Sequence, residues 1–292
     1  MTRPIFSRQA VGWLAVFGSA FCFYLATAII RWGRPYVEVE TSYYVFARFL
    51  LGFLVVCSTM LIGGHRLAPR SYHLLLGRTV ANTIAVFCFY KAIEVGTLAE
   101  ANILNMTYPL FVALFSWFLL KHQRDVFAVV IVVLAFVGIW LILSPERMNV
   151  NWGSLWGLGS GVTAAVAMIY LTLSRQYHDS QTILFFMFGI GMVVVYLFFR
   201  QSIFWPTGID FLFLLACSVA GVLGQYLLTY GYLFVTAVEG SIISSSRILL
   251  AALLGPLLVG DPGLSWSGWC GALLIFMANS ALALRRSRAR PL

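Results

Sequence analysis

The chain has 292 residues, of which 61% are apolar and only 10% are charged, and its formal net charge is +9. Soluble domains carry about 25% charged and 45–50% apolar residues, so an ordinary cytosolic enzyme and a disordered chain are both excluded. The lipid bilayer must be the solvent for this sequence. Because a spanning helix needs roughly 20 apolar residues, the chain can hold about ten of them and no soluble catalytic module.

Ten hydrophobic stretches follow one another along the chain, and none has the alternating pattern of an outer-membrane strand. We therefore predict an all-α integral membrane protein with ten transmembrane helices, at 10–30, 41–62, 71–92, 98–120, 126–143, 153–173, 181–199, 211–235, 237–259 and 266–284. Arg3 and Arg8 precede the first stretch without a small-residue cleavage site, which favours a retained helix over a signal peptide.

The basic residues between these stretches are divided unevenly between the two sides. With the N-terminus inside, the cytoplasmic segments hold eleven: Arg3, Arg8, Arg66, Arg70, Lys121, Arg124, Arg175, Arg285, Arg286, Arg288 and Arg290. The outer segments hold five: Arg31, Arg34, Lys91, Arg147 and Arg200. The positive-inside rule then predicts a multi-pass protein of the inner (plasma) membrane with both termini in the cytoplasm. The excess positive charge is explained by orientation, and we expect no nucleic-acid partner.

Two segments of the chain, 90–121 and 230–261, share a plan when they are laid over one another with an offset of 140. Each has an aromatic helix end, a small-residue corner, a polar turn and then an apolar run with a proline. Because each half would hold five helices, an odd number, the second half enters the membrane from the opposite side. The sequence thus predicts two inverted five-helix repeats, 1–147 and 148–292, in one membrane domain.

The first-half string FCFYKAIEVGTLAEANILNMTYPLFVALFSWFLLKHQ (87–123) resembles the EamA-like branch of the drug/metabolite transporter superfamily. The Arg48 of YVFARF is also similar to the family. The second copy, 228–261, fits the same pattern less well, because its proline, Pro256, lies seven positions beyond the position that matches Pro109. This resemblance implies a carrier of metabolites, with export as the usual direction. It does not imply a particular substrate.

Three arginines lie within predicted helices. Arg247 is about ten residues into the ninth stretch, where a charged side chain costs roughly 2.5–3.5 kcal/mol unless it faces a cavity or a partner. It either meets a carboxylate or phosphate of a substrate, or forms an internal tie that holds the bundle. Arg48 and Arg78 lie about 10–12 Å inside their helices, within reach of the headgroups, so a structural role is favoured for both.

Uncharged polar residues share helix faces on the repeat-related helices. Together with Arg247, the candidate substrate-binding residues are Asn82, Tyr90, Asn102, Asn105, Tyr170, Gln225, Tyr230 and Ser244. Such a stripe avoids lipid, but it can face another helix as easily as a pore. Glu100 is the candidate for proton coupling, because a carboxylate in a low-dielectric cavity can titrate, although pairing with an arginine or Lys91 would also explain it.

No enzyme chemistry is indicated. The sequence has no H-E-x-x-H motif, no pair of intramembrane aspartates and no P-loop, so we expect no catalytic residue, metal or cofactor. The absent P-loop also leaves an ion gradient, exchange or the substrate's own gradient as the source of energy.

These observations predict a secondary-active transporter, an exporter or exchanger, that moves a small organic metabolite such as an amino acid by alternating access through a central cavity between the repeats. The alternatives are a nucleotide-linked or organic-acid exchanger, and a passive channel or membrane sensor. Expected partners are the substrate, membrane lipid and a proton or counter-substrate. The sequence leaves open the substrate's identity, the direction, the coupling and the choice between monomer and homodimer.

Overall fold

The computed structural model describes residues 8–64, 67–119, 126–143, 152–231, 234, 237–260 and 262–288. Within these ranges every long element is a helix and no strand occurs. The helices are α1 (Arg8–Gly33), α2 (Thr41–Gly63), α3 (Tyr72–Val95), α4 (Leu98–Asn105), α5 (Tyr108–Leu119), α6 (Val126–Leu143), α7 (Trp152–Ser174), α8 (Ser180–Phe199), η2 (Arg200–Ser202), α9 (Gly208–Gly231), α10 (Ala237–Leu254), η3 (Gly255–Val259) and α11 (Trp266–Arg288).

Six helices of the described residues are long and apolar enough to cross a membrane: α1, α2, α3, α7, α8 and α9. The other predicted spans correspond to α4 with α5, to α6, to α10 with η3, and to α11. The predicted helix 98–120 is divided into α4 and α5, and the predicted helix 237–259 ends in the π-helical turn η3. The all-helical class is confirmed, whereas ten transmembrane helices remain a prediction.

The break between α4 and α5 follows from Pro109, the second residue of α5. Proline has no N–H to donate to the carbonyl four residues earlier, which here belongs to Asn105, and its ring crowds that carbonyl. Thr107 stabilises the break, because its hydroxyl donates to the carbonyl of Leu104 at 2.6 Å and its carbonyl accepts from the N–H of Leu110 at 2.9 Å. The fourth predicted helix therefore becomes two half-helices.

Capping residues fix several of the helix ends. Thr97 precedes α4 and accepts from the N–H of Glu100, and Asp179 precedes α8 and accepts from the N–H of Thr182, both at 3.3 Å. Gly64 ends α2 with φ of +63°, a left-handed conformation that glycine adopts without strain.

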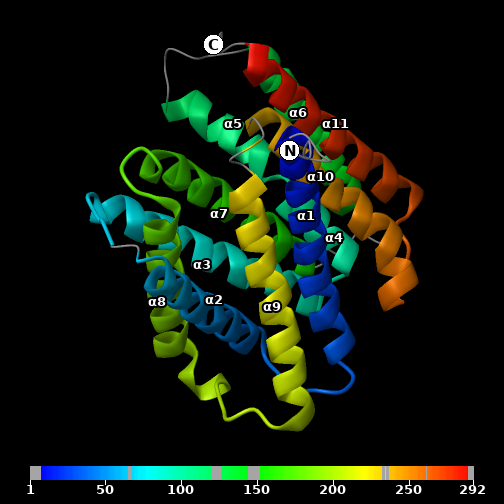
Figure 1. The fold of residues 1–292 in the computed structure, drawn as a ribbon. Coiled ribbons are helices and arrows are strands. Elements are labelled where there is room, and N and C mark those ends of the chain that lie inside the picture. The colour runs from blue at the N-terminus through cyan, green and yellow to red at the C-terminus, as the bar shows by residue number, and fades with distance from the viewer. Residues whose placement is uncertain are drawn as a thin grey trace, which may run out of the picture.

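The helices pack in pairs that link the two halves of the chain. α1 runs along α9, α3 runs along α7, α2 packs on α8, and α6 packs on α11 (Figure 1). One cluster of buried apolar side chains is formed mainly by α1, α2, α3, α8 and α9, with contributions from α4 and α10, and a second by α4, α5, α6, α10 and α11. Glycines allow the backbones of neighbouring helices to approach closely, as where Gly138 of α6 faces Gly271 of α11.

The bundle has two ends of different character. We call the end at which α1 begins and α7 is joined to α8 the terminal end, because both ends of the described chain lie there (Figure 1). At this end Nε2 of His178 accepts from the backbone N–H groups of Arg70 and Ser71 at 3.0 and 3.1 Å, which ties the α7–α8 link to the α2–α3 link.

At the opposite end, which we call the far end, several hydrogen bonds join different helices. The Tyr43 hydroxyl donates to the carbonyl of Phe204 at 2.6 Å, and the Trp32 indole donates to the carbonyl of Leu258 at 2.6 Å. Thr41 of α2 donates to Glu94 of α3, whose carboxylate also pairs with a lysine of the same helix. The far end is therefore tied across α1, α2, α3 and η3.

Candidate functional site

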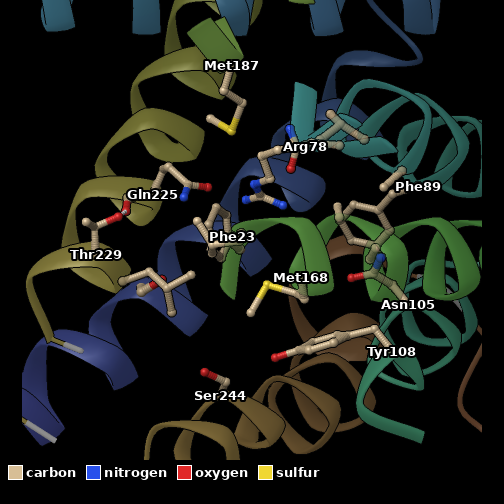
Figure 2. A pocket seen from close by; sticks show the side chains of 18 of the residues that line it. Phe23, Arg78, Phe89, Asn105, Tyr108, Met168, Met187, Gln225, Thr229 and Ser244 are labelled. Carbon is tan, nitrogen blue, oxygen red and sulfur yellow. Dashed lines mark hydrogen bonds between the residues drawn. The ribbon is translucent and has the colours of Figure 1, made fainter. Parts of the chain in front are cut away.

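A cavity of about 320 Å³ lies between the helices and reaches toward the terminal end. Its lining comes from α1, α2, α3, the α4–α5 break, α7, α8, α9 and α10, and none of the lining residues belongs to α6 or α11. Figure 2 shows Gln225 and Thr229 of α9 facing Phe89 of α3 and Tyr108 of α5 across this space. Arg175 and Ser180 line it where α7 is joined to α8, which places its mouth at the terminal end.

Arg247 lies in the cavity wall on α10, where only 6% of the residue is exposed. Its Nη2 donates to Oδ1 of Asn105, the last residue of the half-helix α4. The Asn105 amide then donates to the hydroxyl of Ser160 on α7 at 3.0 Å, and that hydroxyl donates to the carbonyl of Gly157 at 2.6 Å. A cation at the C-terminal end of a half-helix also interacts favourably with the helix dipole.

A second buried arginine, Arg48 of α2, also lines the cavity. Its Nη1 donates to the hydroxyl of Tyr90 at 3.0 Å. The thiol of Cys217 on α9 lies 3.8 Å from the same hydroxyl and 3.4 Å from the carbonyl of Ala26. Tyr90 and Cys217 are fully buried and are not among the residues that line the cavity.

Phe23 lies beside both arginines, and Phe89 lies beside Arg247. The guanidinium carbons of Arg48 and Arg247 are 5.4 and 5.9 Å from the centre of the Phe23 ring, and that of Arg247 is also 5.1 Å from the centre of the Phe89 ring. Cations in such positions are attracted by the negative faces of the rings, by about 0.5–2 kcal/mol each. The rings therefore hold both guanidinium groups near one another without neutralising them.

The cavity is strongly basic. Arg78 and Arg175 line it together with Arg48 and Arg247, and no described aspartate or glutamate is among the lining residues. Arg78 is 5% exposed and Arg175 is exposed at the mouth. The described residues also hold no group of three or more His, Cys, Asp or Glu side chains that could bind a metal ion. The chemistry that this arrangement offers is recognition of negative charge.

The structure brings five of the sequence-predicted site residues to the cavity: Asn82, Asn105, Gln225, Ser244 and Arg247. They come from α3, α4, α9 and α10, the helices on which the polar stripes recur. In Figure 2, Asn105, Gln225 and Ser244 lie on three sides of the same space.

Four other predicted residues lie elsewhere. Tyr90 is behind Arg48, and Asn102 donates to Thr27 at 3.3 Å and to the carbonyl of Leu98, which ties α4 to α1. Tyr170 packs its ring over Gly77, and Tyr230 is 49% exposed, with its ring at right angles to Phe234. None of the four is among the residues that line the cavity.

Glu100 is also outside the cavity lining and lies near the far end, three residues after the cap Thr97. The sequence Thr97-Leu-Ala-Glu100 is the pattern of a capping box, in which the acidic residue supports a helix N-terminus. This position favours a role at the helix end, and proton coupling through Glu100 stays a prediction.

Sequence reasoning underestimated Arg48 and Arg78. Their positions along the helices would allow the side chains to reach the lipid headgroups. In the structure, however, both side chains line the cavity and are buried. The signal available was the cost of a buried charge, which applies to all three intramembrane arginines. Phe23 lies deep in its predicted helix, where an aromatic ring can line a site, but ordinary packing is the commoner role of such residues in a chain with 16% aromatic residues.

A bundle of apolar helices around a basic cavity is the architecture of a multi-pass membrane transporter of small molecules. The chain belongs to the EamA-like transporter family, which matches residues 10–144 and 151–282. It is therefore a transporter and not an enzyme, as the sequence predicted.

Known relatives agree with this class. An uncharacterized transporter of Helicobacter pylori is 32% identical over 215 residues, which cover 71% of this chain and 72% of the relative. The pseudopaline exporter CntI of Pseudomonas aeruginosa is 27% identical over 92% of this chain and 94% of its own length. A solved crystal structure with 17% identity covers 96% of this chain and 98% of its own, with a TM-score of 0.63, which supports the fold alone.

Proposed function

We propose that this protein is a secondary-active exporter or exchanger of a small organic metabolite that carries an anionic group, such as an amino acid. The observation that carries the proposal is the buried Arg247, which lines the cavity and is held by the neutral amide of Asn105. Because no salt bridge joins it to a carboxylate among the described residues, its charge is available to a ligand.

Alternating access between two inverted five-helix repeats, 1–147 and 148–292, is the mechanism that we propose. Two observations support it. The family matches the chain in two consecutive segments. In addition, when the five spans of the first half are matched in order with the five of the second, the packed pair α3–α7 corresponds to the packed pair α9–α1. The cavity reaches the terminal end while hydrogen bonds tie the far end, which fits one state of such a cycle.

We place the protein in the inner (plasma) membrane with both termini in the cytoplasm, as the distribution of basic residues favours. The terminal end is then cytoplasmic, and the cavity would load from the cytoplasm. Loading from this side supports export, the direction named for the relative from Pseudomonas aeruginosa.

The proposal is tested by counterflow in proteoliposomes, with a radiolabelled amino-acid mixture and, in parallel, radiolabelled organic acids, each with and without a pH gradient. A carrier gives transient accumulation that saturates, and a response to the pH gradient indicates proton coupling. A channel shows neither saturation nor counterflow, and a sensor binds its ligand without flux. Either of the last two results would contradict the proposed function.

The variant Arg247→Ala should abolish accumulation while the protein remains monodisperse in detergent. Arg200→Ala is the matched control, because Arg200 is exposed near the far end, outside the cavity. If Arg247→Ala misfolds, Arg247→Lys keeps the charge and should retain part of the activity, whereas full activity of a folded Arg247→Ala would refute a role in substrate binding.

A further inference from the structure

The arginines of the cavity lie at successive depths. Arg175 is at the mouth, one residue after the end of α7. At about 1.5 Å per residue, Arg78 is roughly 9 Å into α3, Arg247 roughly 15 Å into α10, and Arg48 roughly 22 Å from the same end of α2. The positive charge therefore extends along the whole length of the cavity.

The three deeper arginines have hydrogen-bonding capacity left over. Each is at least nine-tenths buried, and the Nε of each has no hydrogen-bond partner within the described part of the chain. Among the described residues, Arg48 donates to the hydroxyl of Tyr90 and Arg247 to the amide of Asn105, and both of these groups are neutral. Each guanidinium group can thus donate to an anionic group without giving up its present partner.

A single carboxylate cannot neutralise charge spread over this depth. Arg78 and Arg48 are separated along the cavity by more than the two oxygens of one carboxylate can span, and each buried guanidinium without an anionic partner is costly in a low-dielectric site. Apolar and aromatic side chains also line the cavity, among them Phe23, Phe89 and Met168, which lie on the same side of Arg78 in Figure 2.

We infer that the cavity binds a small organic dianion: a compound with two anionic groups, carboxylate or phosphate, at opposite ends of an apolar or flat body. One group meets Arg48 and Arg247 beside Phe23, the other meets Arg78 nearer the mouth, and Arg175 attracts the ligand on entry. This inference rests on the proposed function and narrows its substrate class. It assigns the two carboxylates of an acidic amino acid or of a dicarboxylate to defined arginines, and it disfavours amino acids with neutral side chains as substrates.

Ligand binding to the purified protein in detergent tests the inference without transport, through the rise in melting temperature that a bound ligand causes. The probes share a benzene ring and differ in their number of anionic groups: benzene-1,3-dicarboxylate, 3-carboxyphenyl phosphate, benzoate and phenylalanine. We expect the two compounds with two anionic groups to bind at least about tenfold more tightly than benzoate, because the second group adds charge-assisted hydrogen bonds, and phenylalanine to bind no better than benzoate. Comparing the dicarboxylate with 3-carboxyphenyl phosphate distinguishes a carboxylate from a phosphate as the second anionic group.

The preference for two charges should depend on the arginines that receive them. In Arg78→Gln the dicarboxylate should bind no more than a fewfold more tightly than benzoate, while the affinity for benzoate should change little. If Arg78→Gln fails to fold, Arg48→Gln should reduce the preference for two charges in its place. Arg200→Gln should leave the preference unchanged. Equal binding of mono- and dianions, tighter binding of phenylalanine, or no binding of any probe would each overturn the inference.

Failure of the inference and failure of the proposed function give different results. If dianions bind but no labelled compound shows counterflow, the ligand class stands and the carrier function fails. If counterflow is found for neutral amino acids and the dianions neither bind nor compete, the carrier function stands and the inference fails.

Discussion

Asn105 sets the charge that a ligand meets at Arg247, because its amide oxygen is the acceptor for the guanidinium group and its amide nitrogen is tied to Ser160. The amide orients Arg247 and leaves its positive charge intact. A carboxylate at the same position would orient the side chain equally well and neutralise it.

The variant Asn105→Asp separates these two roles. We expect a folded protein whose melting temperature is unchanged or higher, and whose affinity for benzene-1,3-dicarboxylate is lower by about tenfold or more, because one positive charge is already paired. Titration of the melting temperature against the ligand measures both effects. An affinity equal to that of the wild type would show that the charge of Arg247 does not contribute to binding.

Individual residues also mark the limit of sequence-based inference. The cost of burying an arginine predicted that Arg247 faces a cavity or a partner, and the structure gives it both. The same argument did not decide Arg48 and Arg78, since depth within a helix does not determine which face the side chain occupies. Tyr230 matches Tyr90 in the repeat, yet one is half-exposed and the other fully buried. A repeat pattern aligns positions, but packing against neighbouring helices decides what each position faces.

The break between α4 and α5 places Asn105 at the end of a half-helix, close to the middle of the bundle. This break depends on Pro109, which cannot donate to the Asn105 carbonyl. The related proline, Pro256, lies in the π-helical turn η3 at the end of α10, and it is not among the cavity-lining residues.

Replacing Pro109 therefore tests the importance of the break. In Pro109→Ala the restored N–H can donate to Asn105, which would join α4 to α5 and turn the Asn105 side chain away from Arg247. We expect a folded protein whose initial rate of counterflow falls about tenfold, because a displacement of this order at a binding group is costly. Pro256→Ala is the control and should transport at nearly the wild-type rate. A wild-type rate of counterflow in both variants would show that the break is dispensable.

Helices as such were predictable, because apolar stretches of about 20 residues in a chain with 10% charge leave few alternatives. Their ends follow local signals that a sequence also carries, such as Thr97 before α4 and Gly64 after α2. The division of the fourth helix was not predicted, since a proline is compatible with a kinked continuous helix. Whether the break opens depends on partners such as Thr107 and Arg247 that become neighbours only in the fold.

The molecule as a whole is asymmetric across its two ends. Hydrogen bonds tie the far end, whereas the cavity reaches the terminal end through residues such as Thr229 and Arg175. The class of fold and the family were accessible from composition and from the string 87–123. The cavity, in contrast, depends on how nine helices are rotated relative to one another, which no single stretch specifies.

Side-specific labelling tests the orientation of this asymmetry. Thr229→Cys and Trp205→Cys are made in a variant whose five native cysteines are replaced. Because Thr229 lines the cavity and Trp205 is 90% exposed near the far end, a membrane-impermeant maleimide should label the first in inside-out vesicles and the second in right-side-out vesicles. Saturating dicarboxylate should slow labelling of Thr229→Cys only. The reverse pattern of labelling would place the terminal end outside.

The most direct measurement is counterflow of radiolabelled benzene-1,3-dicarboxylate into proteoliposomes that contain the wild type, Arg247→Gln or Arg200→Gln, each shown to be folded. A carrier that recognises a dianion through its cavity arginines gives transient, saturable accumulation with the wild type and Arg200→Gln and none above background with Arg247→Gln. Equal accumulation with all three proteins, or none with any of them, would contradict that account.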